Sequence, residues 1–128
     1  MKLILYPTLA ETLELHKRLI EQFGGQHGVR DLGLLQSALS RPQTGYYKTL
    51  FLQSAALLQS LTQNHAFIDG NKRLAFALTA IFLRMNHYRL IVDPDNGEDF
   101  IIKKLIQEKM ELEKISEWLK SHSQKVKV

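Results

Sequence analysis

The chain has no cysteine among its 128 residues. Disulfides and thiolate chemistry are therefore excluded, and any zinc site would have to be built from histidine and carboxylate side chains alone. A protein that needs no disulfides is suited to a reducing compartment. We therefore expect a cytoplasmic location.

Long hydrophobic runs are also lacking. The longest, around residues 74–83, falls far short of the roughly 20 residues that a membrane-spanning helix needs. Near the start, Pro7 interrupts an apolar run that is already too short for a signal peptide. We expect a soluble protein without membrane contact. Strand-like alternation, internal repeats and low-complexity segments are absent as well, so no sheet is predicted.

The charge balance is moderately basic, because 17 lysine and arginine residues against 13 aspartate and glutamate residues give a formal net charge of +4. In the C-terminal third the lysines alternate with acidic residues, which is typical of a solvated helix face. We therefore expect no direct DNA binding. A positive field nevertheless favours an acidic partner or a nucleotide.

Helical spacing of the apolar residues covers most of the chain. Thr8 and Glu11 are placed to form a capping box at the first helix, and Asp31 is the expected cap of the second. A turn-rich break is expected at residues 93–97. The predicted helices span residues 8–23, 31–40, 49–64, 70–86, 99–107 and 111–122.

These helices predict an all-α fold, because a chain of this length forms one domain with a core of its own. The helix over residues 70–86 is apolar on nearly every face, which indicates a buried central position. We therefore predict a compact bundle of about six helices around it, as a single domain over residues 1–122. Residues 123–128 are predicted to be a flexible tail.

The most informative stretch is residues 65–73, which read HAFIDGNKR and open the central helix. Gly70 permits a turn that leaves the first amides of this helix free, and free amides at a helix start bind anions. Asn71 lies in this first turn. Lys72 and Arg73 add two whole positive charges, which makes a di- or triphosphate a better guest than a single carboxylate.

Two further side chains of this stretch suit phosphate chemistry. His65 follows a predicted helix and is a candidate general base for an incoming hydroxyl. A magnesium ion would link the Asp69 carboxylate to phosphates that it would otherwise repel. Each residue alone has an ordinary structural explanation, but two cations at a helix start oppose the helix dipole unless an anion binds there. We expect Phe67 to point inward and to be structural.

The stretch resembles a known signature, H-x-F-x-[DN]-[GA]-N-K-R, of the death-on-curing (Doc) toxins, a branch of the Fic fold. All nine positions match. Residues 24–42 also resemble the N-terminal half of these toxins. The resemblance thus covers essentially the whole chain and implies the Fic/Doc-type helical bundle.

The resemblance implies an ATP-dependent transferase. His65 would be the catalytic base, Asp69 the Mg²⁺ ligand, and the nucleotide-binding residues would be Gly70, Asn71, Lys72 and Arg73. Most Fic enzymes transfer AMP to a protein hydroxyl. In the Doc branch a lysine, here Lys72, replaces a glycine of the general motif and obstructs part of the anion site, and ATP then presents its γ-phosphate. The branch resembles protein kinases that phosphorylate a threonine of elongation factor Tu and arrest translation.

The implied setting is a type II toxin–antitoxin pair. Phe76 occupies the position of the second arginine of general Fic motifs, and no self-inhibitory helix motif is present. The resemblance therefore implies inhibition by a separate antitoxin, whose C-terminal segment folds on binding. Three alternatives stay open at this point: AMP transfer, a non-catalytic regulator linked to antitoxin or DNA, and metal-dependent hydrolysis at His65 and Asp69.

Overall fold

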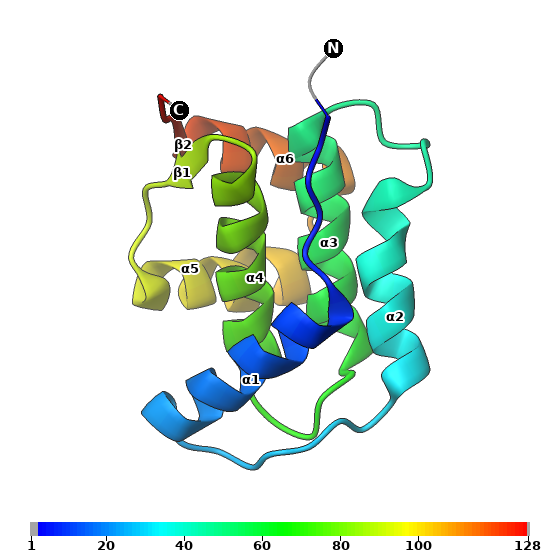
Figure 1. Cartoon of the computed structure of the whole chain (residues 1–128). Coiled ribbons are helices and arrows are strands. Elements are labelled where there is room, and N and C mark those ends of the chain that lie inside the picture. Colours follow the sequence, from blue (N-terminus) through cyan, green and yellow to red (C-terminus); the bar gives the residue numbers. More distant parts are fainter. Residues whose placement is uncertain (1–2, 128) are drawn as a thin grey trace.

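The structure, a computed structural model, describes residues 3–127 (Figure 1). It confirms the all-α bundle. The described residues form helices α1 (Leu9–Phe23), α2 (Leu32–Ser40), α3 (Leu50–Asn64), α4 (Asn71–Met85), α5 (Pro94–Phe100) and α6 (Leu112–Ser121). They also form a 3-10 turn η1 (Arg41–Gln43), a π-helix η2 (Ile101–Gln107) and strands β1 (Tyr88–Leu90) and β2 (Ser123–Lys125).

Helices α1 and α2 begin directly after their predicted caps, and α3 begins one residue after its predicted start at Thr49. The Thr8 hydroxyl accepts a hydrogen bond from the Glu11 amide, and the Glu11 carboxylate accepts one from the Thr8 amide, which completes the capping box. The hydrogen bonds hold the pKa of Glu11 below its usual range, because they favour the ionised form. Asp31 and Thr49 cap α2 and α3 in the same way.

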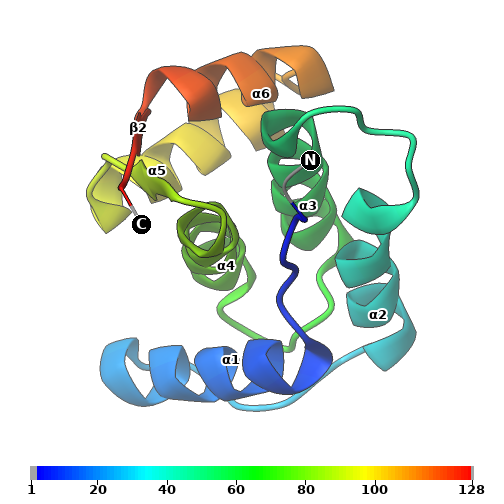
Figure 2. The same ribbon diagram turned by 45° about the horizontal axis from the view of Figure 1, so that its top comes forward.

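The core lies between α3 and α4, which pack side by side at the centre of the bundle (Figures 1 and 2). In Figure 2 α4 is viewed nearly end-on, with α1 on one side and α6 on the other. Helix α3 is the more deeply buried of the two, since α4 keeps Ile81 on an exposed face. The predicted central helix therefore shares the centre with α3.

The predicted break at residues 93–97 is wrong, because α5 begins there. Asp93 caps the helix through the amide of Asn96, and Pro94 occupies the first helical position, where a missing amide hydrogen costs nothing. Gly97 is buried within α5 against the ring of Phe76, and a Cβ atom there would clash with that ring. Tertiary packing thus explains a glycine that locally indicated a turn.

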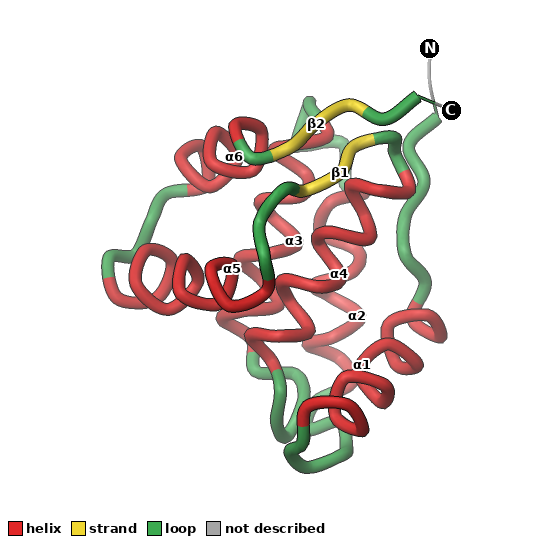
Figure 3. Tube along the Cα trace, turned by 90° about the vertical axis from the view of Figure 1, so that its left-hand side faces the viewer, coloured by secondary structure: helices red, strands yellow, loops and turns green. Residues whose placement is uncertain are grey.

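The prediction of no strand is also wrong. β1 and β2 pair antiparallel, with Arg89 opposite Gln124, and lie together beside the C-terminal end of α4 (Figure 3). The segment predicted as a flexible tail therefore begins with a strand, while Val128 lies outside the described residues. Only three residues on each side pair, so the backbone bonds leave no periodic signal in the sequence. Across residues 3–127, no helix is both long enough and apolar enough to span a bilayer.

Candidate functional site

The loop from His65 to Gly70 links the end of α3 to the start of α4, and both of its ends are left-handed. His65, at the end of α3, has a φ of 49°, and Gly70, before α4, has a φ of 74°. Glycine takes this conformation without cost, whereas a residue with a Cβ atom takes it rarely. The tertiary structure therefore holds His65 in place from several sides.

Asn71 and Phe67 hold the loop from within. The Asn71 side chain accepts a hydrogen bond from the Phe67 amide at 3.0 Å and donates one to the Phe67 carbonyl at 2.9 Å. The Phe67 ring is buried in the core, as predicted. These two bonds fix the Asn71 side chain on the loop, while its backbone amide, in the first turn of α4, stays free to meet a ligand.

His16, a buried residue of α1, packs against the loop. Its ring stacks on Phe67, with the ring centroids 3.8 Å apart, and its Nε2 lies 2.8 Å from the carbonyl oxygen of Asp69. The ring is buried in α1, beneath the turn that carries the candidate metal ligand. No local signal in the sequence marks His16 as part of the site, because its partners lie about 50 residues away.

The segment between α1 and α2 covers the other side of the loop. The Gln26 amide donates to the Asp69 carboxylate at 3.1 Å, and the Arg30 amide donates to the Ala66 carbonyl at 2.8 Å. The Arg30 guanidinium donates to the His65 carbonyl and to the Asn64 carbonyl, which closes the end of α3. Arg30 thus has a structural role, because its guanidinium and its amide fix the backbone of residues 64–66.

The start of α4 has no side-chain cap. The first intrahelical bond runs from the Leu74 amide to the Gly70 carbonyl, so the amides of Asn71, Lys72 and Arg73 have no partner within the helix. These amides carry the positive end of the helix dipole. The arrangement is a candidate anion site, since free amides at a helix start are the groups that accept phosphate.

This helix start opens into a pocket of about 500 Å³. We call it the α4 pocket. Its polar lining includes His65, Asp69, Lys72 and Arg73, and its apolar lining comes from Leu19, Ile20 and Phe23 of α1 and Ile102 of η2. All six predicted site residues line this one cavity, together with these apolar side chains. Their roles stay predictions.

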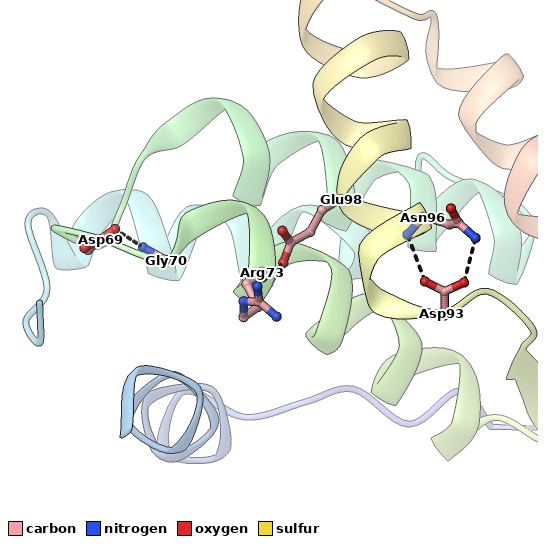
Figure 4. Close-up of polar contacts among 6 residues, drawn as sticks. All are labelled: Asp69, Gly70, Arg73, Asp93, Asn96 and Glu98. Carbon is pink, nitrogen blue, oxygen red and sulfur yellow. Dashed lines mark hydrogen bonds and ion pairs between the residues drawn. The ribbon is translucent and has the colours of Figure 1, made fainter. Parts of the chain in front are cut away.

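Arg73 is already engaged in this pocket. Figure 4 shows its side chain directed from α4 toward Glu98 of α5, and the two side chains form an ion pair at 3.0 Å. The guanidinium also lies over the Phe23 ring, 3.9 Å from its centroid. Sequence reasoning assigned Glu98 to a solvated helix face and missed this contact. A bound phosphate would share Arg73 with Glu98 or displace the carboxylate.

The His65 and Lys72 side chains are exposed at the mouth of the α4 pocket. Among residues 3–127, no side-chain hydrogen bond engages the His65 imidazole, although the His65 backbone is fixed by Arg30. An imidazole that is free at its ring and anchored at its main chain can exchange a proton with a bound reactant.

The Asp69 carboxylate fits the ligand preference of Mg²⁺. One oxygen accepts the Gly70 amide at 2.8 Å and the other accepts the Gln26 amide, and each keeps a lone pair. No group of three or more histidine or acidic side chains converges anywhere in the part of the chain that the structure describes. A cation at Asp69 would therefore take its remaining ligands from phosphate oxygens and water, as Mg²⁺ commonly does.

Comparison with known proteins gives two kinds of match. The sequence profile of the Fic/DOC family matches residues 6–83, which is more than half of the chain. The chain is similar to "Toxin Doc" of Mycolicibacterium smegmatis, with 49% identity over 86 residues. It is also similar to "Protein kinase doc" of Escherichia phage P1, with 33% identity over 89 residues. The matched segments cover 62% and 66% of this chain, and 66% and 71% of the respective relatives.

Proposed function

This chain belongs to the Fic/DOC family, and we propose that it is the toxin of a toxin–antitoxin pair that transfers the γ-phosphate of ATP to a protein hydroxyl. The observation that carries the proposal is the uncapped start of α4, which meets His65 and Asp69 in one pocket. The names of the two relatives, a toxin and a protein kinase, support the same reading.

The donor would bind with its phosphates at the start of α4. The amides of Asn71, Lys72 and Arg73 and the two side-chain cations supply the positive potential that a triphosphate requires. The apolar side chains of α1, with Phe23 nearest to Arg73, give the nucleoside a wall in the same pocket. A magnesium ion held by Asp69 would neutralise phosphate charge when bound.

His65 would act as general base. Its neutral ring nitrogen takes the proton of the acceptor hydroxyl while the hydroxyl oxygen forms a bond to the γ-phosphorus. The bond between this phosphorus and the bridging oxygen breaks, and ADP leaves with that oxygen. The acceptor becomes a phosphate ester. No covalent enzyme intermediate is needed, so the chain supplies position, charge and a proton acceptor.

We assign the choice between phosphate and AMP transfer to Lys72. Its side chain stands at the mouth of the α4 pocket, where the general Fic motif has glycine, and it occupies space and adds charge at the first helical turn. Phe76, at the position of the second arginine of that motif, packs against α5 instead of facing a phosphate. Both substitutions favour γ-phosphate transfer, while AMP transfer is the second candidate.

The proposed acceptor is a threonine of elongation factor Tu, whose modification would arrest translation. The test is to incubate the purified chain and elongation factor Tu with Mg²⁺ and with ATP labelled on either the α- or the γ-phosphate. We expect label from the γ position only. Label from the α position would contradict phosphate transfer and favour AMP transfer.

His65→Asn is the matched control, because asparagine tolerates the left-handed backbone of this position but offers no base. We expect this variant to bind ATP while its transfer rate falls by about 10²- to 10⁴-fold. If it transfers label as the wild type does, or arrests cell growth equally, the enzymatic proposal is wrong and a non-catalytic regulator is favoured.

The proposed partner is a cognate antitoxin whose C-terminal segment folds on binding. The support is the family assignment together with the name of one relative, a toxin. Co-expression with the neighbouring open reading frame tests this proposal. We expect growth to be restored and the two proteins to be purified together.

A further inference from the structure

A second pocket, of about 630 Å³, adjoins the α4 pocket and shares His65 and Lys72 with it. Its other walls come from the last turns of α3, the end of η2 and the turn before α6. We call it the α6 pocket. We propose that it receives the segment of the acceptor protein that carries the reacting hydroxyl. This inference rests on the proposed function and adds where the acceptor binds.

The two pockets differ in what they can hold. The α4 pocket combines the uncapped start of α4 with an apolar wall, so it can take both the phosphates and the nucleoside of the donor. The α6 pocket also contains a helix start, but Glu111 is the residue at that position. A phosphate placed at that helix start would meet this carboxylate and be repelled by it, whereas the start of α4 has no such acidic cap. The donor therefore fits the first pocket and leaves the second for the acceptor.

The lining of the α6 pocket suits a polypeptide. Ile106 is 40% exposed in its wall, with the half-buried Met110 beside the buried Leu105. Flexible methionine and exposed aliphatic side chains accommodate varied apolar residues of a partner. Lys109 and Lys72 supply positive charge against the one carboxylate of Glu111. The expected segment has an apolar side chain near its hydroxyl and an acidic residue within reach of Lys109.

Local irregularities concentrate around this pocket. Residues 101–107 form a π-helix, and Lys109 takes a left-handed backbone with a φ of 50°. The buried Thr62 hydroxyl, in the wall of the pocket, has no hydrogen-bond partner in the described structure. Each departure costs free energy, and such departures are retained mainly at functional sites. The pocket is therefore more than a gap between packed helices.

His65 lies where a donor in the α4 pocket and an acceptor in the α6 pocket would meet. It lines both pockets, so a hydroxyl presented from the α6 pocket and a phosphate held in the α4 pocket would meet beside its imidazole. A general base must contact the acceptor hydroxyl. In-line transfer places the acceptor oxygen and the leaving oxygen of the donor on opposite sides of the γ-phosphorus. A single shared cavity would not separate the reactants in this way.

The test uses Ile106→Glu with Ile81→Glu as its control. Both isoleucines are 40% exposed, but Ile81 lies on α4 away from both pockets. A second variant, Gln63→Trp, fills the pocket from an exposed position of α3. Two acceptors are tested separately: elongation factor Tu and the total protein of growing cells. Transfer to each is followed with ATP labelled on the γ-phosphate. ATP affinity is measured on the same preparations.

We expect Ile106→Glu and Gln63→Trp to lower kcat/KM for the acceptor by at least about tenfold, with ATP affinity and the behaviour of Ile81→Glu unchanged within about twofold. Unchanged labelling in both variants would overturn the inference while the proposed function stands. A loss of ATP affinity in both variants would also overturn it, since the pocket would then hold the nucleotide. If the wild type binds ATP but labels no protein, the proposed function fails and this inference with it.

Discussion

Helices α3 and α4 are both 15 residues long and pack side by side, but they begin in opposite ways. At the start of α3, the Thr49 hydroxyl accepts the Leu52 amide at 3.1 Å. At the start of α4, Gly70 offers no side chain, and Lys72 and Arg73 place positive charge where the helix dipole is already positive. One helix start is stabilised by a side-chain cap, and the other leaves its first amides without an intrahelical partner.

The cost of the open end indicates its use. A helix start without a side-chain cap loses about 1 kcal/mol of stability, and each cation placed there lowers the stability by a few tenths of a kcal/mol more. Asp31 and Asp93 show that this chain caps helices with a carboxylate elsewhere. The same residue type lies next to α4, but Asp69 bonds the amides of Gln26 and Gly70 and leaves those of α4 free. The difference is therefore local to the site.

The largest expected effect comes from replacing His65, which lies between the end of α3 and the start of α4. His65→Asn should lower the transfer rate by about 10²- to 10⁴-fold, the usual contribution of a positioned general base. Thermal unfolding should change little, because the ring is exposed and has no hydrogen bond in the described structure. The measurement is label transfer at saturating ATP, followed by the melting temperature. A rate within threefold of the wild type would remove His65 from the role of base.

Replacing His16, which packs against the loop between α3 and α4, should have the next largest effect. His16→Ala removes the stack on Phe67 and leaves the Asp69 carbonyl without its partner, and we expect a loss of about 3 kcal/mol in the free energy of unfolding. Urea denaturation measures it. His16→Gln keeps a hydrogen-bond donor but cannot stack, and it should lose less. Equal losses in both variants would show that the hydrogen bond contributes nothing.

A capping carboxylate placed at the open end would make α4 resemble the other helices. Gly70→Asp puts negative charge among the free amides, and we expect ATP affinity to fall at least about tenfold, equivalent to about 1.4 kcal/mol. Gly70→Asn is the matched control. It has the same tolerance for a left-handed backbone and the same approach to Ile20, but no charge. An identical loss in the two variants would mean that shape, not charge, weakens binding.

The capped end should respond in the opposite manner. Thr49→Ala should reduce the free energy of unfolding by about 1 kcal/mol, because the Leu52 amide loses its acceptor. ATP affinity and label transfer should stay at wild-type values. Denaturation and a binding titration on one preparation test both halves. A change in transfer without a change in stability would break the distinction between the two helix starts.

The smallest expected effect is the pH dependence of the first helix. The hydrogen bonds with Thr8 lower the pKa of Glu11 in the folded chain, so its stabilising contribution is present above the unfolded pKa and is lost as pH falls through the folded pKa. In Glu11→Gln that dependence disappears. The stability difference between the two proteins should therefore be largest near neutral pH and shrink in acid. A difference that is constant with pH would contradict the assignment.

Much of the fold could be predicted from local signals. Thr8 and Asp31 mark helix starts because a cap acts within three residues, and α1, α2 and α3 end at their predicted last residues. The start of α5 was missed because Gly97 indicates a turn, and its reason, the Phe76 ring, comes from another helix. The strands were missed because each is three residues long and is recognised only by its partner.

The sequence by itself determined which chemical groups residues 65–73 bring together, because the histidine, the carboxylate, the glycine and the two cations lie within nine residues. It also predicted the helix that they open, because helical spacing is a local signal. Only the tertiary structure decided what surrounds them. His16, Arg30 and Glu98 reach the site from segments 25 to 53 residues away, and the α6 pocket exists only where α3, η2 and the turn before α6 meet. Contacts between distant segments depend on packing, and packing leaves no pattern along the chain.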